Sequence, residues 1–304
     1  MTTPDFVHRF TEIATTPEPE LASAALFIAK LEYPKLDTSR YLAKLDEMGA
    51  TAAERIAAFG ETVDPMSRIT EISSYLFKQE GFTGNQNNYE DLRNSFLNEV
   101  LDRRTGIPIS LSIVYIEVAR RAGVEIHGIN FPGHFLLKVP MPPEAVLSHD
   151  TEVIIDPFHG GGVLSESDCR DLLQKHAGEK AAFDRHLLSR ATKPQILVRM
   201  LVNLKRLYVN MKSFPQAHTI TELLLGLDPS AITELRDRGL LAYHLNRYAA
   251  ALRDLEAYLR FTASKEMIRA PEEIDNHGET EEISEHAEIW EHVKALRRRV
   301  ASFN

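Results

Sequence analysis

Three short segments between Asn94 and Gly162 decide the fold of this chain: Pro108-Ile109-Ser110-Leu111-Ser112-Ile113-Val114-Tyr115, then Gly133-His134-Phe135, then Ile155-Asp156-Pro157. The first segment predicts a buried helix, because Pro108 suits a first helical turn and most residues after it are apolar. A serine at the start of this helix is followed along the chain by a histidine and an aspartate. Thiol enzymes place a nucleophile, a base and an orienting group in this order, with a cysteine activated at the helix N-terminus. This chain has no cysteine at that position.

Short apolar or alternating segments follow the helix and predict three antiparallel strands, at residues 124–131, 134–139 and 152–155. The prolines at 140, 142 and 143 end the second strand, because proline donates no hydrogen bond to a sheet. A return of the chain after this loop brings Asp156 back towards His134. We therefore predict a core over residues 105–190, made of the helix and a small antiparallel sheet.

Helical patterns flank this core on both sides, so the predicted fold class is α+β. Residues 1–104 predict a helical region packed on the core, in which Thr51-Ala52-Ala53-Glu54 has the pattern of a capping box that opens a helix. In residues 194–262, apolar residues recur with the period of about 34 residues that is typical of tetratricopeptide helix pairs. Residues 263–304 predict an acidic linker and a last helix that caps the repeats.

The composition of the chain excludes several classes of partner. The net charge of the 304 residues is −9 and the arginine pairs are isolated, so we predict no nucleic-acid partner. No apolar run has the length of a membrane span and the first residues lack the pattern of a signal peptide, so we expect a cytoplasmic protein that binds no membrane. The sequence does not indicate an oligomeric state.

Cysteine and histidine usage predicts no cofactor and no metal ligands. The single cysteine excludes an internal disulfide and a site built from several thiolates. The twelve histidines form no H-x-x-x-H pair, so only assembly of distant residues would create a metal site. Cys169 lies in step with Leu172 and Leu173 on the packed face of a predicted helix, and we expect an unreactive thiol. The run His159-Gly160-Gly161-Gly162 is similar to the oxyanion loop of lipases, but the chain has no G-x-S-x-G and we interpret the run as a flexible turn.

The residues around the three segments resemble one protein family. The resemblance to the SirB-type branch of the transglutaminase-like superfamily is dense over residues 75–165 and extends over about residues 20–262. It implies a papain-like transglutaminase core fused to tetratricopeptide repeats, with His134 and Asp156 matching the histidine and aspartate of the superfamily. The cysteine of the active members falls between Pro108 and Ser110, where this chain has none. The matching stretches are Asn94-Ser95-Phe96-Leu97-Asn98-Glu99-Val100-Leu101, Arg103-Arg104-Thr105-Gly106-Ile107-Pro108-Ile109-Ser110-Leu111, Asn130-Phe131-Pro132-Gly133-His134-Phe135 and Ile155-Asp156-Pro157-Phe158.

Three hypotheses about function follow. We favour a non-catalytic regulatory or protein-binding module, which keeps the cleft for a peptide or protein segment and uses the repeats as a second interaction surface. The second hypothesis is a hydrolase or acyltransferase in which Ser110 attacks an amide or ester, His134 is the general base and Asp156 orients the imidazole. The third gives all three residues a structural role, with a helix-start serine that binds backbone. A hydroxyl ionises far less readily than a thiol, so we do not expect an ordinary transglutaminase or thiol protease.

Overall fold

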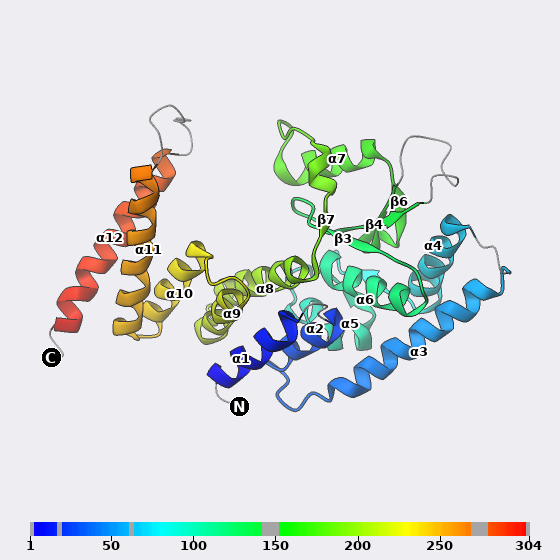
Figure 1. Cartoon of the computed structure of the whole chain (residues 1–304), viewed down its shortest axis with the longest axis horizontal. Coiled ribbons are helices and arrows are strands. Elements are labelled where there is room, and N and C mark those ends of the chain that lie inside the picture. The colour runs from blue at the N-terminus through cyan, green and yellow to red at the C-terminus, as the bar shows by residue number, and fades with distance from the viewer. Residues whose placement is uncertain (1–2, 17–19, 61–63, 142–151, 269–278, 302–304) are drawn as a thin grey trace. The chain divides into compact units, whose positions relative to one another are not determined.

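The computed structural model describes residues 3–16, 20–60, 64–141, 152–268 and 279–301, and of residues 263–268, 279–287 and 301 it describes only the backbone. Helices make up most of the chain and a small antiparallel sheet lies in its middle third (Figure 1), which confirms the predicted α+β class. Contacts divide the chain into two units, Glu12–Asn203 and Met1–Thr11 with Leu204–Asn304. Pro142 and Pro143, predicted to end a strand, and residues 271–278 of the predicted linker lie outside the described residues.

The five-stranded sheet is antiparallel throughout, with the strand order β6-β5-β4-β3-β7. Its three inner strands are those that the alternating sequence predicted. The two edge strands, of three and two residues, were not predicted. A separate parallel pair of two-residue strands lies earlier in the chain. The strands are β1 (Thr83–Gly84), β2 (Thr105–Gly106), β3 (His127–Ile129), β4 (Leu136–Pro140), β5 (Glu152–Asp156), β6 (Gly162–Leu164) and β7 (Arg190–Ala191).

Helix α6 (Pro108–Arg121) forms the centre of the larger unit, and every residue from Pro108 to Ala119 is buried. Proline at its first position loses nothing, because the N–H groups of a first helical turn have no partner within the helix. The Tyr115 hydroxyl near its middle donates to the Ile69 carbonyl at 3.1 Å, so a buried polar group is satisfied. Burying each large aliphatic side chain of this helix stabilises the fold by roughly 1.5–3 kcal/mol.

Helices before α6 cover it and extend the core. Asp37 begins α3 by accepting a hydrogen bond from the Ser39 N–H at 3.1 Å. The prediction of a helix start at Thr51 is wrong, because α3 continues through this residue and its hydroxyl donates to the Glu47 carbonyl at 3.0 Å. The helices of this region are α2 (Leu21–Ala29), α3 (Thr38–Ala57), α4 (Pro65–Ser73), the π-helix η1 (Ser74–Gln79), the 3-10 helix η2 (Leu92–Ser95) and α5 (Leu97–Arg103).

Helix α7 (Glu166–Ala177) packs against the sheet. Ser165 and Asp168 form a capping box at its start, with the Ser165 N–H donating to the Asp168 carboxylate at 2.8 Å and the Asp168 N–H to the Ser165 hydroxyl at 3.2 Å. Cys169 is fully buried in this interface, as the sequence predicted, and burial raises its pKa to about 11. The interface core consists of Ile129, Phe131, Leu136, Ile154, Cys169 and Leu173. Two 3-10 helices, η4 (Pro157–His159) and η5 (Arg185–Leu188), lie in the connections around it.

The second unit is helical, and its helices follow the predicted repeat. The neighbouring helices α10 and α11 pack through the small side chains of Ala242 and Ala251, which let the two helices approach closely. Helix α12 packs on α11 through Ile289, Val293 and Leu296, whereas Trp290 is 43% exposed. The helices are α1 (Thr3–Ala14), α8 (Lys193–Asn210), which begins in the first unit, α9 (Phe214–Leu227), α10 (Ile232–His244), α11 (Tyr248–Ile268) and α12 (Glu279–Ala301).

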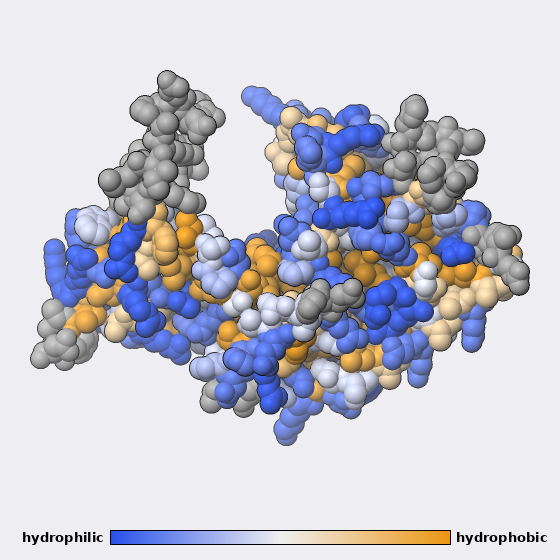
Figure 2. All heavy atoms as spheres, in the orientation of Figure 1, coloured by the Kyte–Doolittle hydropathy of each residue, from blue (hydrophilic) through white to orange (hydrophobic). Residues whose placement is uncertain are grey.

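Hydrophilic residues dominate the face of the molecule drawn in Figure 2, with apolar residues between them in smaller patches. Among the described helices, none is both long and apolar enough to span a membrane.

Candidate functional site

A tight turn places His134 immediately before strand β4. The His134 N–H donates to the Phe131 carbonyl at 3.0 Å, and Gly133 has φ +68°. Proline at the second position and a left-handed glycine at the third are the pattern of a type II turn. The imidazole is therefore held by a rigid connection between β3 and β4, and only 4% of the residue is exposed.

The register of the sheet brings Asp156 to His134. Leu137 pairs with Ile155, so Asp156 at the end of β5 stands opposite Leu136. His134 lies two positions before Leu136, on the same face of the sheet, because side chains alternate along a strand. His134 Nε2 and Asp156 Oδ1 are 2.9 Å apart, and both side chains are 3% exposed. Two of the three predicted site residues are thus adjacent.

The Asp156 carboxylate binds a second imidazole that the sequence analysis assigned to a turn. His159 Nδ1 lies 2.6 Å from Asp156 Oδ2, and the Phe158 N–H donates to Asp156 Oδ1 at 2.9 Å. Burial alone raises the pKa of this carboxyl, but the hydrogen bonds and charges of His134 and His159 outweigh burial and hold the pKa below its ordinary value. Asp156 is therefore a buried anion with a partner on each oxygen.

Ser110 lies in a separate hydrogen-bond network at the start of α6. Its hydroxyl donates to the Asn94 carbonyl at 2.6 Å and accepts the Ile107 N–H at 3.0 Å, and the residue is 1% exposed. Ser110 is the third residue of the helix, where a side-chain oxygen can accept the N–H of the residue that precedes the helix. Across the described residues no hydrogen bond joins Ser110 to His134.

Ser112, one half-turn further on, differs from Ser110. It is fully buried, and its hydroxyl has no hydrogen-bond partner among the residues that the structure describes. A buried hydroxyl without a partner carries a desolvation cost of roughly 1–3 kcal/mol, so such groups are uncommon. From the sequence, Ser110 is the better candidate because it lies in the first turn of the helix. No local signal shows that its hydroxyl is engaged or that the Ser112 hydroxyl is unpaired.

Aromatic rings surround the pair of His134 and Asp156. The His134 ring stacks with those of His159 and His176, with a centroid distance of 5.8 Å to each and interplanar angles of 21° and 19°. Gly133 makes room for His176, because a Cβ at Gly133 would lie 2.5 Å from the His176 Cβ. Partial burial, and then the nearby His134, lower the pKa of His176. Three histidines and one aspartate therefore share one place, although no local histidine motif predicted it.

A match over more than half of the chain agrees with this geometry. Residues 39–202 match the family described as the transglutaminase-like superfamily. The chain belongs to the transglutaminase-like superfamily. Within this transglutaminase-like protein, the matched range contains α6, the sheet and the His134–Asp156 pair.

The transglutaminase-like protein also has relatives that cover most of its length. It is 38% identical over 257 residues to a UPF0162 protein of Xylella fastidiosa (strain Temecula1), covering 82% of this chain and 87% of that protein. It is 30% identical over 244 residues to a UPF0162 protein of Pseudomonas aeruginosa, covering 79% and 84%. The F-box only protein 21 of Homo sapiens is 32% identical over 189 residues, which is 60% of this chain and 29% of that protein.

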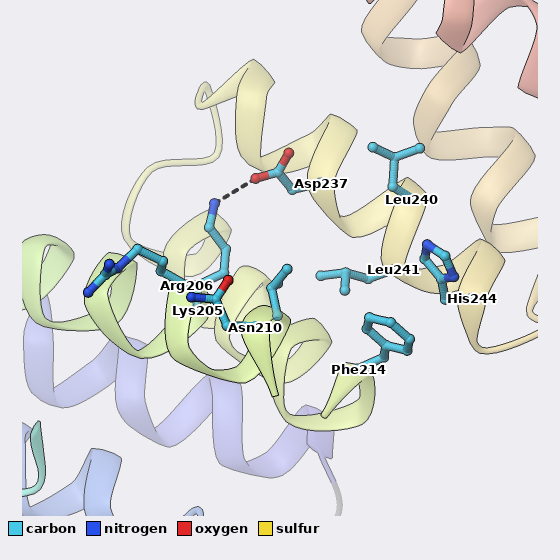
Figure 3. A pocket seen from close by; sticks show the side chains of 9 residues that line it. Lys205, Arg206, Asn210, Phe214, Asp237, Leu240, Leu241 and His244 are labelled. Carbon is cyan, nitrogen blue, oxygen red and sulfur yellow. Dashed lines mark hydrogen bonds and ion pairs between the residues drawn. The ribbon is translucent and has the colours of Figure 1, made fainter. Parts of the chain in front are cut away.

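The second unit of the transglutaminase-like protein matches the tetratricopeptide repeat over residues 204–297, and such repeats generally bind proteins. Helices α8, α9 and α10 form a cavity of about 360 Å³ (Figure 3). The Phe214 and His244 rings stack at 4.6 Å on one side of it, and the Lys205 ammonium is 2.7 Å from the Asp237 carboxylate on the other. The cavity is lined by Lys205, Arg206, Val209, Asn210, Phe214, Asp237, Leu240, Leu241 and His244.

Proposed function

We propose that this protein is a non-catalytic, protein-binding module of the cytoplasm that has a regulatory or scaffolding role. Its tetratricopeptide unit binds a segment of a protein partner, and the transglutaminase-like cleft is a second surface for a peptide. The observation that carries the proposal is the Ser110 hydroxyl, which donates to the Asn94 carbonyl and not to an imidazole. A serine engaged in this way has no base to take its proton, so binding is the role that the geometry supports best.

The cavity formed by α8, α9 and α10, called the groove below, supports binding through apolar contacts. Val209 is 41% exposed at this groove, and Leu240, Leu241 and Phe214 add apolar surface beside it. The Lys205–Asp237 ion pair provides a polar edge. Apolar centres with polar rims are typical of protein interfaces. We infer that the partner inserts an apolar side chain of an extended or helical segment here.

A matched pair of surface substitutions tests this proposal. Val209→Glu places a charge in the cavity, and Val163→Glu places the same charge on β6, where the residue is 54% exposed. A partner recovered with the full-length protein is purified, and its affinity for the wild type and both variants is measured by calorimetry. We expect Val209→Glu to weaken binding by about tenfold or more, as at interface hot spots, and Val163→Glu to leave it unchanged. Equal affinities for the wild type and Val209→Glu would exclude the groove.

The alternative is a serine-dependent hydrolase or acyltransferase that uses Ser110, His134 and Asp156. The 2.9 Å contact of His134 with Asp156 favours it, because an oriented imidazole is what a general base requires. Labelling with a fluorophosphonate probe distinguishes the functions, with Ser112→Ala as the control for Ser110→Ala. If the protein is a serine hydrolase or acyltransferase, the probe labels the wild type and Ser112→Ala, and only Ser110→Ala abolishes the labelling. The binding module predicts no labelling of the wild type or of either variant.

A further inference from the structure

Two histidines and an aspartate of the candidate site direct their ligand atoms at one another. One ligand atom each of His134, Asp156 and His159 lie within 4.8 Å of one another. Both oxygens of the carboxylate are in use, one towards each imidazole. Orienting a single catalytic histidine needs one carboxylate oxygen, so a triad does not explain the second imidazole.

We propose that His134, Asp156 and His159 bind a divalent transition-metal ion, and that Zn²⁺ is the ion they suit best. Two imidazole nitrogens and one carboxylate oxygen are a donor set that Zn²⁺ takes in proteins, whereas Ca²⁺ and Mg²⁺ require mostly oxygen ligands. The proposal goes beyond protein binding and does not depend on the tetratricopeptide groove. It also replaces the sequence-based prediction of no metal ligands, because the sheet assembles residues that no local motif connects.

The spacing of the donor atoms fits an ion with small adjustments. Ligand atoms about 2.1 Å from Zn²⁺ lie about 3.4 Å apart at a tetrahedral angle. His134 Nε2 and His159 Nδ1 lie 2.9 Å and 2.6 Å from the two Asp156 oxygens, in contacts that share protons. An ion that replaces these protons widens each of these two contacts by less than about an ångström. All three ligand atoms already lie within 4.8 Å of one another, so the two nitrogens need at most a modest approach. The His134 and His159 rings are close to parallel, at 21°.

The proposed metal site combines two buried ligands with one that is exposed to solvent. His134 is buried immediately before β4 and Asp156 is buried at the end of β5, and the Phe158 N–H donates to the Asp156 carboxylate at 2.9 Å. The His159 side chain is 46% exposed, so the ion has a path to solvent. Three protein ligands with a solvent-facing fourth position are the arrangement of catalytic rather than structural zinc sites. The fourth ligand is a water molecule or an oxygen of a bound carboxylate or carbonyl group.

Calorimetric titration of the full-length, chelator-treated protein with Zn²⁺ tests the site. We expect the wild type to bind one Zn²⁺ per chain. His159→Ala and His134→Ala should each bind Zn²⁺ at least tenfold more weakly than the wild type. His159 is half exposed, so its variant keeps the fold, which circular dichroism checks. The control is His186→Ala, which removes an exposed histidine outside the cluster and leaves the affinity unchanged. Absent binding, or binding that His159→Ala leaves intact, overturns the proposal.

Cobalt provides a readout of the ligands themselves. Co²⁺ bound to the wild type gives visible d–d absorption, whose intensity reports the coordination geometry. We expect His159→Ala to change this spectrum and His186→Ala to preserve it; an unchanged spectrum in His159→Ala places the ion elsewhere and refutes the site. Val209→Glu separates the two proposals, because it weakens partner binding alone and leaves Zn²⁺ and Co²⁺ binding intact.

Discussion

Asp156 is the residue on which the geometry of the candidate site depends. Its carboxylate accepts hydrogen bonds from two imidazoles and from the Phe158 N–H while only 2% of the residue is exposed. A buried carboxylate without such partners would be protonated rather than charged. The three donors therefore decide that this group is an anion.

Replacing this anion by an amide is expected to destabilise the larger unit. Asp156→Asn keeps the size of the side chain but leaves one imidazole without its acceptor, which costs roughly 1–3 kcal/mol of the free energy of unfolding. Hydrogen–deuterium exchange of the β4 and β5 amides measures this change. Asp171→Asn, on the exposed face of α7, is the matched control and should alter exchange little. Equal protection in both variants would contradict the role given to Asp156.

The stability that Asp156 contributes also has a defined dependence on pH. Its pKa in the folded chain lies below the ordinary value of 3.8, so the unfolded chain binds this proton more tightly. The contribution is therefore complete above pH 3.8 and is lost as the pH falls through the folded pKa. We expect the difference in free energy of unfolding between the wild type and Asp156→Asn to be constant from pH 7 to about 5 and to shrink below pH 3.8. A difference that grows in acid would refute this assignment.

Sequence reasoning located part of the site at the scale of single residues. His134 and Asp156 were predicted because they follow the helix-start serine in the order that thiol enzymes use, and because they match the histidine and aspartate of the family that the sequence resembles. His159 was assigned to a turn, although a histidine three residues after an aspartate is a signal for a shared hydrogen bond. The partner of Ser110 had no signal, because the Asn94 carbonyl lies sixteen positions away and is backbone.

The turn before β4 is the element that sets the position of the imidazole. Gly133 adopts φ +68°, and a Cβ there would lie 2.5 Å from His176 of α7. Glycine meets two requirements at once, since it accepts the left-handed backbone and leaves space for a neighbouring helix. The turn and α7 are therefore fitted to each other.

Gly123 provides a matched test of this second requirement. It has φ +75° after α6, but nothing lies within 4 Å of a Cβ placed there. Both Gly133→Ala and Gly123→Ala strain the backbone by roughly 1–2 kcal/mol, and only Gly133→Ala adds overlap with His176. We expect the greater loss of stability in Gly133→Ala, measured by urea unfolding with far-UV circular dichroism. Equal losses would mean that His176 moves aside freely.

Elements were predictable where one local signal was strong. Helix α6 combines Pro108 at its first position with a long apolar run, and its start was predicted correctly. Strands β6 and β7 were missed, because they contain three and two residues and β6 begins with a glycine. The sequence split α3 at Thr51, since a threonine hydroxyl that binds its own helix looks the same as a cap.

At the scale of the whole molecule, the chain consists of two units with separate cores. One core forms between the sheet and α7, and another between α10, α11 and α12. The period of the apolar residues predicted the second core, because each repeat supplies the same contacts to its neighbour. The first core depends on long-range pairing of strands, for which the sequence provides alternation but not the partners.

The reactivity of Cys169, the single cysteine, shows whether the core between the sheet and α7 opens only when the protein unfolds. Cys169 is fully buried with a pKa of about 11, so both access and ionisation oppose its reaction. At pH 8 we expect a disulfide reagent to modify the native protein at the rate of unfolding and the urea-unfolded protein at once. Ser189→Cys adds an exposed thiol as the control, which should react immediately in the folded chain. Rapid modification of Cys169 in the native state would show local opening of α7.

The single tryptophan of this chain, Trp290, belongs to α12, and its single cysteine belongs to α7. Each unit thus contains one natural reporter that the other lacks, and no engineered label is required to follow them independently. Trp290 fluorescence and Cys169 modification, measured along one denaturant series, would show whether the two units unfold together or one after the other.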